Sequence, residues 1–198
     1  SLGLANTAGS LSMLDNFPRR DAHLVNKLKK SGFLIVGKAN LSEWANFRGR
    51  NSVSGWSSYG GQTRNPYNLD YNPCGSSSGS AAAVALGLTP VSIGTETNGS
   101  ITCPASINGV VGIKPTVGLV SRHGIIPISS TQDTAGPMAR NVYDAAIVLK
   151  TISGKDLKDK ATGEIPSNFD FSGLINLNKN YLKGKKIGLI YPSEEDLE

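Results

Sequence analysis

The sequence predicts an α/β fold with a mixed β-sheet core covered by helices. Two successive patterns support this class. A helical segment over residues 22–31 precedes the apolar run 33–36, and an Ala-rich helical segment from Ser80 to Leu86 precedes a second apolar run, 90–93. Helices that alternate with short apolar strands are typical of this class. Ligands in such folds bind at the carboxyl ends of strands, so we expect a site directly after residue 93.

The first third of the chain predicts a helix, a strand and a long loop. Asp21 is the expected N-cap of the helix over 22–31, and Gly32 is its stop signal. Phe33-Leu34-Ile35-Val36 has the continuous apolar pattern of a buried strand in a parallel sheet. Asn40 can cap a brief helix. Residues 48–75 lack apolar periodicity, and a loop of that length inside a domain predicts a wall of a binding pocket.

The remaining elements follow from helix caps and apolar runs. Gly87 ends the Ala-rich helix, Pro104 fits the first turn of a short helix that Gly109 ends, and Asn141 begins a helix over about 142–152. Residues 110–113 and 117–120 have strand-like patterns, and 124–130 is expected to continue as extended chain. Residues 186–191 predict one more strand, and the chain from Ser193 predicts the start of another helix.

Composition limits the partners of the protein. The 198 residues carry a net charge of +5, spread along the chain without a dense basic run, which argues against nucleic-acid binding. No apolar segment approaches the roughly 20 residues that span a bilayer, and no leader opens the chain. Because we expect the natural N-terminus to be missing, that observation says little about secretion, and the compartment stays unassigned with the cytoplasm favoured.

The two cysteines do not form a disulfide framework of the kind seen in small secreted domains. Cys74 lies two residues before Ser76 and Cys103 lies three residues after Ser100, both in segments rich in hydroxyl side chains, so each cysteine is also a candidate nucleophile. We expect both to be small packing residues behind the loops, because no His stands near them in sequence to act as a base.

The chain contains only two histidines, which limits a Ser-His-Asp triad or a metal site. His23 and His123 are the only candidate bases of that type, and His23 falls on a charged helix face where a solvated surface role is expected. Zinc or two-metal chemistry needs more His, Cys or carboxylate ligands at suitable spacing, so we expect no metal and no cofactor.

Two small, hydroxyl-rich loops form the strongest functional signal. One is Cys74-Gly75-Ser76-Ser77-Ser78-Gly79-Ser80, and the other is Gly94-Thr95-Glu96-Thr97-Asn98-Gly99-Ser100. Small residues let backbone N–H groups approach a reacting atom, and hydroxyls can act as nucleophile or proton carrier. By composition alone, such clusters are more often ordinary loops.

These two loops and one further motif make the sequence similar to the amidase signature family. The stretch 75–83, the stretch 94–105 and the segment Gly109-Val110-Val111-Gly112-Ile113-Lys114-Pro115-Thr116 carry the resemblance in unbroken order. Within that family, residues 40–49 and 60–67 are most similar to bacterial peptide amidases. The resemblance implies that 1–198 is the N-terminal to central portion of a single amidase signature domain, and therefore a fragment.

The resemblance also implies a Ser-cisSer-Lys triad. Ser100 is the implied acylated nucleophile, and Ser76, after a cis peptide bond from Gly75, relays its proton to a lysine. The family lysine stands before a segment like residues 7–10, and no lysine precedes that segment here. We therefore expect the catalytic lysine to lie outside this chain, with Lys38 and Lys114 as the alternatives within it.

Backbone N–H groups of Thr97, Asn98, Gly99 and Ser100 are the implied oxyanion hole. Asn98 and Ser78 stand where the family commonly has glycine. Asn tolerates left-handed backbone angles, so the first departure is compatible with the assignment.

Other polar residues have weaker assignments. Asn46, Gln62 and Arg64 lie in the expected pocket loop, where they either bind substrate backbone groups or stabilise the loop. Thr131, Gln132 and Asp133 resemble a family segment that supports the nucleophile loop, and we expect Asp133 to be structural.

The sequence therefore predicts an enzyme that cleaves a carbon–nitrogen amide bond through an acyl-Ser100 intermediate. A C-terminal peptide amide is the favoured substrate, with release of ammonia. Two alternatives stay open: the glutamine-hydrolysing subunit of an amidotransferase, with a protein partner and tRNA, and a catalytically silent binding fragment. Neither acyl preference nor oligomeric state follows from the sequence.

Overall fold

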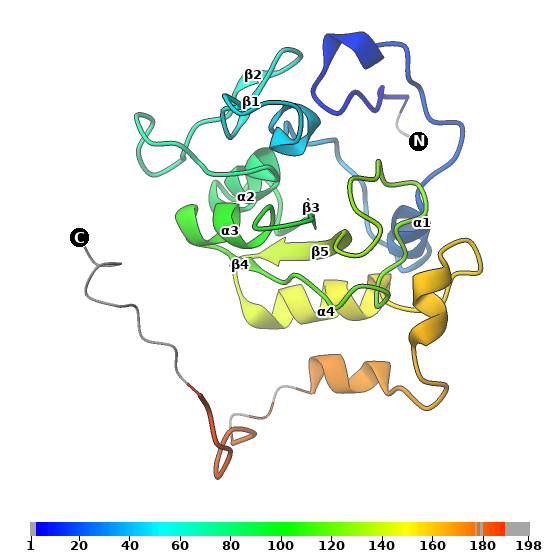
Figure 1. Ribbon diagram of the computed structural model, residues 1–198. Helices are drawn as coiled ribbons and strands as arrows, with labels where there is room; N and C mark the ends of the chain where they lie inside the picture. The colour runs from blue at the N-terminus through cyan, green and yellow to red at the C-terminus, as the bar shows by residue number, and fades with distance from the viewer. Residues whose placement is uncertain (1–2, 177, 179, 189–198) are drawn as a thin grey trace.

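The computed structural model describes residues 3–176, 178 and 180–188. Its centre is a three-stranded antiparallel sheet in the order β3-β5-β4 (Figure 1). Strand β3 is Val91–Glu96, β4 is Val111–Gly112 and β5 is Thr134–Ala139. Helices lie on both faces, so the α/β class is confirmed, although every strand pair among the described residues is antiparallel.

Sequence patterns missed the central strand, β5. Its sequence, TAGPMA, contains Gly136 and Pro137, which normally argue against a central strand. A Cβ on Gly136 would lie 1.9 Å from the carbonyl oxygen of Ile113, so only glycine fits there. Pro137 faces the point where β4 has ended, and its carbonyl still accepts the N–H of Ile113 at 3.0 Å. Local propensity is thus overridden by close packing of neighbouring strands.

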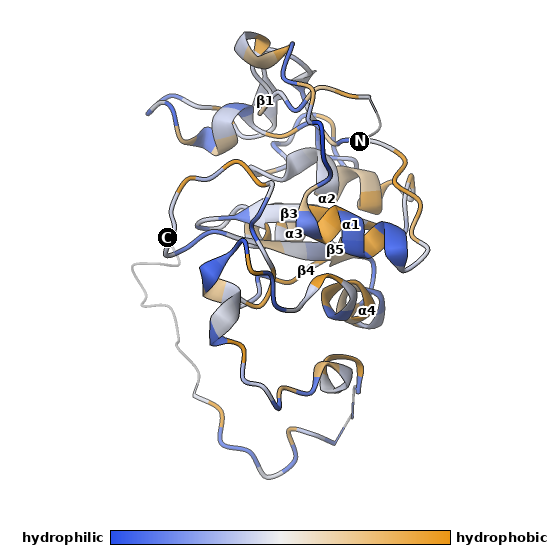
Figure 2. Cartoon of the chain, turned by 90° about the vertical axis from the view of Figure 1, so that its right-hand side faces the viewer, coloured by the Kyte–Doolittle hydropathy of each residue, from blue (hydrophilic) through white to orange (hydrophobic). Residues whose placement is uncertain are grey.

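Two layers of helix cover the sheet. Helix α2 (Ser78–Ala85) and helix α3 (Thr102–Ile107) lie on one face, and helix α4 (Val142–Ile152) lies on the other (Figure 1). Helix α1 (His23–Lys30) packs beside α4. In Figure 2 the ribbons of α1 and α4 carry orange, hydrophobic residues. The main core is made of these buried side chains: Leu24, Leu28, Val120, Ala135, Val148, Leu149 and Ile152.

The helix caps largely follow the sequence. Asn141 caps α4 by accepting the N–H of Asp144 at 2.8 Å, and Gly87 follows α2 with a φ of 72°. The predicted capping by Asp21 is wrong. Ala22 occupies the N-cap position, and the carboxylate of Asp21 instead contacts Nζ of Lys29, a residue in the last turn of α1, at 2.7 Å.

The predicted strand at 33–36 is also wrong for the described part of the chain. The segment is extended, but it pairs with no described strand. Phe33 and Ile35 pack against the main core, whereas Leu34 and Val36 are 85% and 73% exposed. The predicted strand at 117–120 is reduced to one bridge, between Val120 and Ser153.

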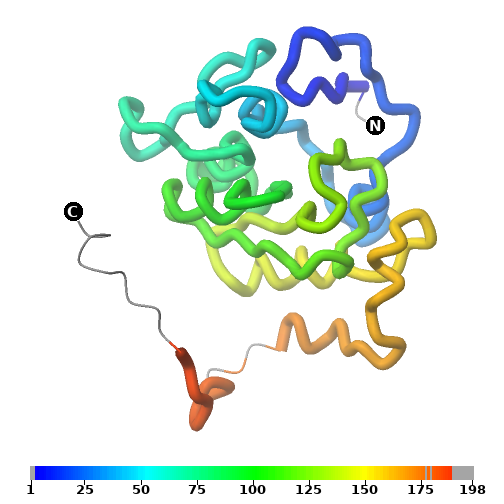
Figure 3. Tube along the Cα trace, viewed as in Figure 1, coloured from blue at the N-terminus to red at the C-terminus, as the bar shows by residue number. Residues whose placement is uncertain are grey.

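The long loop over 40–75 covers the face of the sheet opposite α4. It contains one turn of 3-10 helix, Glu43–Asn46, and a small hairpin of β1 (Trp56–Ser57) and β2 (Gly61–Gln62). In Figure 3 it runs from blue to green above α2 and α3. The strand predicted for 186–191 is irregular at 186–188, and its remainder and the helix predicted from Ser193 fall outside the described residues.

Candidate active site

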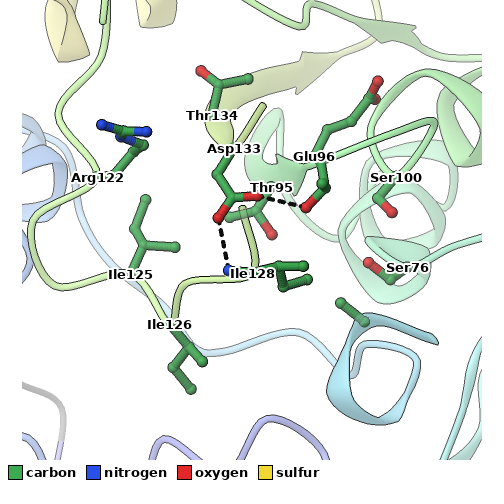
Figure 4. A pocket seen from close by; sticks show the side chains of 12 residues that line it. Ser76, Thr95, Glu96, Ser100, Arg122, Ile125, Ile126, Ile128, Asp133 and Thr134 are labelled. Carbon is green, nitrogen blue, oxygen red and sulfur yellow. Dashed lines mark hydrogen bonds between the residues drawn. The ribbon is translucent and has the colours of Figure 1, made fainter. Parts of the chain in front are cut away.

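The two hydroxyl-rich loops meet at one cavity. Ser76 precedes α2 and is 2% exposed, and Ser100 follows β3 by four residues. The peptide bond between Gly75 and Ser76 is cis, as the resemblance implies. Both serines line the cavity, and their side chains lie side by side at one end of it (Figure 4). The structure thus brings together the two hydroxyls that the sequence singled out.

Ser77 connects the two loops through the backbone. Its N–H donates to the carbonyl of Ser100 at 3.1 Å, and its hydroxyl contacts both the carbonyl and the N–H of Thr95 at 3.1 Å. Among the contacts of the described residues, no hydrogen bond joins the hydroxyls of Ser76 and Ser100 directly. The loops are therefore held by Ser77, and the two hydroxyls remain available to other partners.

The two cysteines form a disulfide, which corrects the expectation that they are separate packing residues. Cys74 and Cys103 are bonded with their Cα atoms 5.9 Å apart. The bond links the residue before Gly75 to the first turn of α3, three residues after Ser100.

Glu96 organises the nucleophile loop, a role that sequence reasoning missed. Its carboxylate is 5% exposed and accepts the N–H groups of Ile101 at 2.7 Å and Thr102 at 2.9 Å. Burial raises the pKa of Glu96, but donation from backbone N–H groups, including that of Gly99, outweighs burial and holds the pKa below its ordinary value. A carboxylate at the end of a strand, directly before the small polar residues 97–100, was the available signal.

In the expected oxyanion loop, residues 97–100, the left-handed backbone position is at Gly99 and not at Asn98. Gly99, with a φ of 78°, is its left-handed residue, whereas Asn98 does not have a positive φ. Asn98 is exposed and Gly99 is half-buried. The tolerance of Asn for left-handed angles is therefore not needed at position 98.

Asp133 supports this loop, as the family resemblance implies. One carboxylate oxygen accepts the hydroxyl of Thr97 at 2.6 Å, and the other accepts the N–H groups of Ile128 and Ser129 at 2.7 and 2.8 Å (Figure 4). The same aspartate thus fixes the start of the nucleophile loop, residues 97–100, and the segment 128–129 on the cavity wall. The neighbouring Gln132 contributes its carbonyl to Lys114.

Arg122 forms the far end of the cavity. Its side chain lies away from the serines in Figure 4 and pairs with Asp159 through Nε at 2.9 Å and Nη2 at 2.8 Å. Donation from Arg122 lowers the pKa of Asp159 to about 2. This pair attaches the 121–130 segment to the chain that follows α4.

The histidines belong to a separate cluster. His23 Nδ1 lies 3.1 Å from Asp156 Oδ2, and His123 Nδ1 lies 3.8 Å from the same atom. His23 is therefore partnered rather than purely solvated, because its helix packs against the 121–123 segment. Neither histidine lines the serine cavity.

The two alternative lysine bases also lie outside the serine cavity. Lys38 Nζ donates to the carbonyls of Leu4 and Ala5 at 3.0 Å each, and burial lowers its pKa. Lys114 Nζ contacts Gln132 on the surface. No described lysine lines the cavity that holds Ser76 and Ser100.

The three candidate substrate-binding residues, Asn46, Gln62 and Arg64, do not lie together in the structure. Asn46 and Gln62 line a second cavity of about 590 Å³, whereas Arg64 is exposed and donates to the carbonyl of Leu69 at 3.2 Å. Gln62 donates to the carbonyls of Ser54 and Thr63. Its amide therefore also stabilises the loop, which is the alternative that the sequence left open.

The described residues contain no group of three or more His, Cys, Asp or Glu side chains placed to hold a metal ion. In the same part of the chain, every helix is too short or too polar to cross a bilayer.

Comparison with known proteins places this geometry in a family. Residues 2–198 match the family model described as Amidase. The native peptide amidase from Stenotrophomonas maltophilia superposes with a TM-score of 0.83 and 62% identity, over 85% of this chain and 34% of that one. A protein of Arabidopsis thaliana named as a probable amidase is 50% identical over 94% of this chain and 37% of its own length.

Amidotransferase subunits match as well. A glutamyl-tRNA(Gln) amidotransferase subunit of Acinetobacter baumannii is 47% identical over 94% of this chain. The chain spans 31 to 37% of the length of the curated relatives it matches. Since the family model covers nearly every residue and the expected serine loops converge on one cavity, the chain belongs to the amidase family.

Proposed function

We propose that the protein hydrolyses a carbon–nitrogen amide bond, favouring a C-terminal peptide amide, through an acyl-Ser100 intermediate. The observation that carries the proposal is the convergence of Ser100 and Ser76 on one cavity. The 62% identity to a peptide amidase structure favours the peptide amide over other amides.

The proposed reaction has two stages. Ser100 Oγ attacks the amide carbonyl, and its proton passes through Ser76 to a lysine that is not among those of this chain. The C–N bond breaks, the nitrogen takes the proton, and ammonia leaves an ester on Ser100. Water then cleaves the ester to give a carboxylic acid and restore the serine.

Preorganised donors stabilise the oxyanion of the tetrahedral intermediate in this proposal. Backbone N–H groups of the segment 97–100 are the candidates, and each such donor typically contributes about 3 to 4 kcal/mol. Glu96 and Asp133 hold that segment from both ends. Because the donors are fixed before substrate arrives, little reorganisation is needed when charge develops.

The proposal is tested by serine substitutions in the full-length protein. Ser100→Ala should abolish both turnover of peptide amides and labelling by a fluorophosphonate probe, because the nucleophile is lost. Ser76→Ala should leave slow turnover, because water can partly replace a proton relay. Ser106→Ala, an exposed serine on α3, is the matched control and should keep full activity.

Other outcomes have definite meanings. An unaltered rate in Ser100→Ala ends the assignment of the nucleophile. A wild-type protein that is never labelled at Ser100 supports the non-catalytic alternative.

Glutamine hydrolysis within an amidotransferase is the second candidate, favoured by the 47% identity to one of its subunits. The two candidates differ in substrate. Ammonia release from glutamine that rises with a partner protein and tRNA, without release from peptide amides, would replace the first proposal by the second.

A further inference from the structure

The sequence contains the pair Asn-Gly twice, in two very different environments. Asn98-Gly99 lies in the nucleophile loop, and Asn108-Gly109 directly follows helix α3. Asparagine is a chemically labile residue, and a glycine after it has no side chain to obstruct attack by its backbone nitrogen on the asparagine amide. The two pairs therefore allow one reaction to be compared at two sites of the same molecule.

The side chain of Asn98 is open to solvent. It is exposed, and its amide forms no hydrogen bond with the residues that the structure describes. A Cβ built on Gly99 would meet nothing within 4 Å, so no other part of the described chain crowds the glycine on that side. The amide of Asn98 can therefore turn toward the next backbone nitrogen without breaking a contact.

Glu96 supplies an acceptor for the proton that the nitrogen of Gly99 must lose before it attacks. Burial raises the pKa of Glu96, but backbone donors, among them the N–H of Gly99, hold that pKa below its ordinary value. The carboxylate is therefore ionised at neutral pH and accepts from the nitrogen that acts as nucleophile. A base in this position assists removal of the proton.

The second pair is held in a way that opposes the same reaction. Asn108 is fully buried, and its Nδ2 donates to the carbonyls of Pro73 and Pro104 at 2.7 Å each. The N–H of Gly109 donates to the carbonyl of Ser106 at 3.2 Å, and a carbonyl oxygen is a much weaker base than a carboxylate. Attack on Asn108 requires this part of the chain to open locally first.

We propose that Asn98-Gly99 is a site of spontaneous covalent modification, at which Asn98 becomes a succinimide and then aspartate or isoaspartate. The nitrogen of Gly99 attacks Cγ of Asn98 and forms a C–N bond, its proton passes to the departing amide nitrogen, and ammonia leaves. Water then opens the cyclic imide. Attack at the side-chain carbonyl gives aspartate, and attack at the backbone carbonyl gives isoaspartate. Each conversion consumes one water and releases one ammonia.

The modification removes or displaces hydrogen-bond donors that the proposed function uses. In the succinimide the nitrogen of Gly99 carries no hydrogen, so one candidate oxyanion donor is lost. In isoaspartate one additional carbon enters the backbone before Gly99 and displaces the N–H groups of Gly99 and Ser100. Loss of one such donor typically lowers kcat by about 10²- to 10³-fold. This consequence rests on the proposed function, whereas the chemistry at Asn98 does not.

Peptide mapping tests the modification independently of activity. Full-length protein is incubated at mildly alkaline pH, where the glycine nitrogen loses its proton more readily, and fragment masses then locate the succinimide and its hydrolysis products. Asn98 should be converted at least about tenfold faster than Asn108, because reaction at Asn108 requires local opening. Equal conversion at the two sites, or an Asn98 that stays unmodified, would overturn the proposal.

Activity measurements on the same samples test the consequence. Turnover of a peptide amide by wild type should fall in proportion to the combined fraction of succinimide and isoaspartate at position 98. Asn98→Gln, whose amide lies one methylene further from the backbone, should lose its own starting activity at least about tenfold more slowly, because ring closure is less favourable. The exposed Asn168→Gln is the matched control, since Asn168 precedes Phe169 rather than a glycine, and it should lose activity at the wild-type rate.

The two measurements fail in different ways. If Asn98 is converted while turnover by wild type stays constant, the consequence for the oxyanion donors is overturned and the modification site stands. If fresh wild type hydrolyses no peptide amide and Ser100 stays unlabelled, the proposed function fails, and peptide mapping alone decides whether Asn98 is modified.

Discussion

Glu96 shows how a single buried carboxylate can position a nucleophile that it does not touch. One of its oxygens, Oε2, accepts the N–H groups of both Ile101 and Thr102, which directly follow Ser100, and so fixes the path of the backbone there. Hydrogen bonds to a charged acceptor are stronger than neutral ones, at about 1.5 to 3 kcal/mol each. Glu96 is therefore a positioning residue, whose effect reaches the reaction through Ser100.

Glu96→Gln should lower kcat by about 10- to 100-fold with little change in KM, because the loop loses charge-assisted bonds while the substrate cavity keeps its walls. Steady-state kinetics on a peptide amide check this. The exposed Glu164→Gln is the control and should behave as wild type. A rise in KM alone would show that Glu96 shapes substrate binding instead.

The loops that carry Ser76 and Ser100 are joined by covalent and hydrogen bonds as well as by packing. The Cys74–Cys103 bond links the loop before α2 to α3, and Asn108 Nδ2 reinforces that link by donating to the carbonyl of Pro73 at 2.7 Å. Helix α2 and strand β3 connect the same two loops through the chain. The serine loops are thus closed into a ring of covalent and hydrogen bonds.

Opening the Cys74–Cys103 bond should lower both stability and kcat. A sequence separation of 29 residues corresponds to about 3 to 4 kcal/mol of stability in the chain-entropy model. Dithiothreitol should therefore reduce the rate of wild type, and the double variant Cys74→Ser/Cys103→Ser should be slow with or without reductant. Peptide mapping should recover the cross-linked pair, and two free thiols in unreduced native protein would contradict the expectation.

At the scale of the molecule, the cavity is closed by segments far apart in sequence. Arg122 lies in the loop between β4 and β5, and Asp159 follows α4; their bidentate pair fixes that loop. The side chain of Asp159 is only 7% exposed, so solvent screens the pair weakly. The shape of the cavity therefore depends on chain that lies beyond the motifs.

The Asp159–Arg122 pair should make stability depend on pH in acid. Because the folded pKa of Asp159, about 2, lies below its usual 3.8, the contribution is fully present above about pH 4 and is lost as pH falls toward 2. This difference between the folded and the usual pKa of Asp159 corresponds to about 2 kcal/mol in the free energy of unfolding. Urea unfolding at pH 5 and pH 2.5 measures it, and Asp159→Asn should lose this part of the dependence while the exposed Asp70→Asn keeps it.

The 198-residue chain should be nearly silent by itself. No described lysine lines the serine cavity, and a positioned base typically contributes about 10²- to 10⁴-fold. We expect ammonia release from a peptide amide to be at least about 100-fold slower than in the full-length protein at equal concentration. Comparable rates that disappear in Lys38→Met or Lys114→Met would identify one of these lysines as the base.

The sequence by itself determined the α-helices and the identity of the serine loops. Apolar spacing and caps such as Asn141 located α1, α2 and α4, because these signals act within one or two turns of chain. The glycine- and serine-rich motifs indicated Ser76 and Ser100 because their residue types are specific to a family. Both kinds of information are local.

Only the tertiary structure decided which other segments those elements contact. Strand β5 lies at the centre of the sheet despite Gly136 and Pro137, since its neighbours, rather than its own propensity, define its place. Likewise, the Cys74–Cys103 bond, the donors gathered by Glu96 and the Arg122–Asp159 pair join residues whose proximity no spacing predicts. Contacts between distant segments depend on how the chain packs, and local sequence patterns carry little of that information.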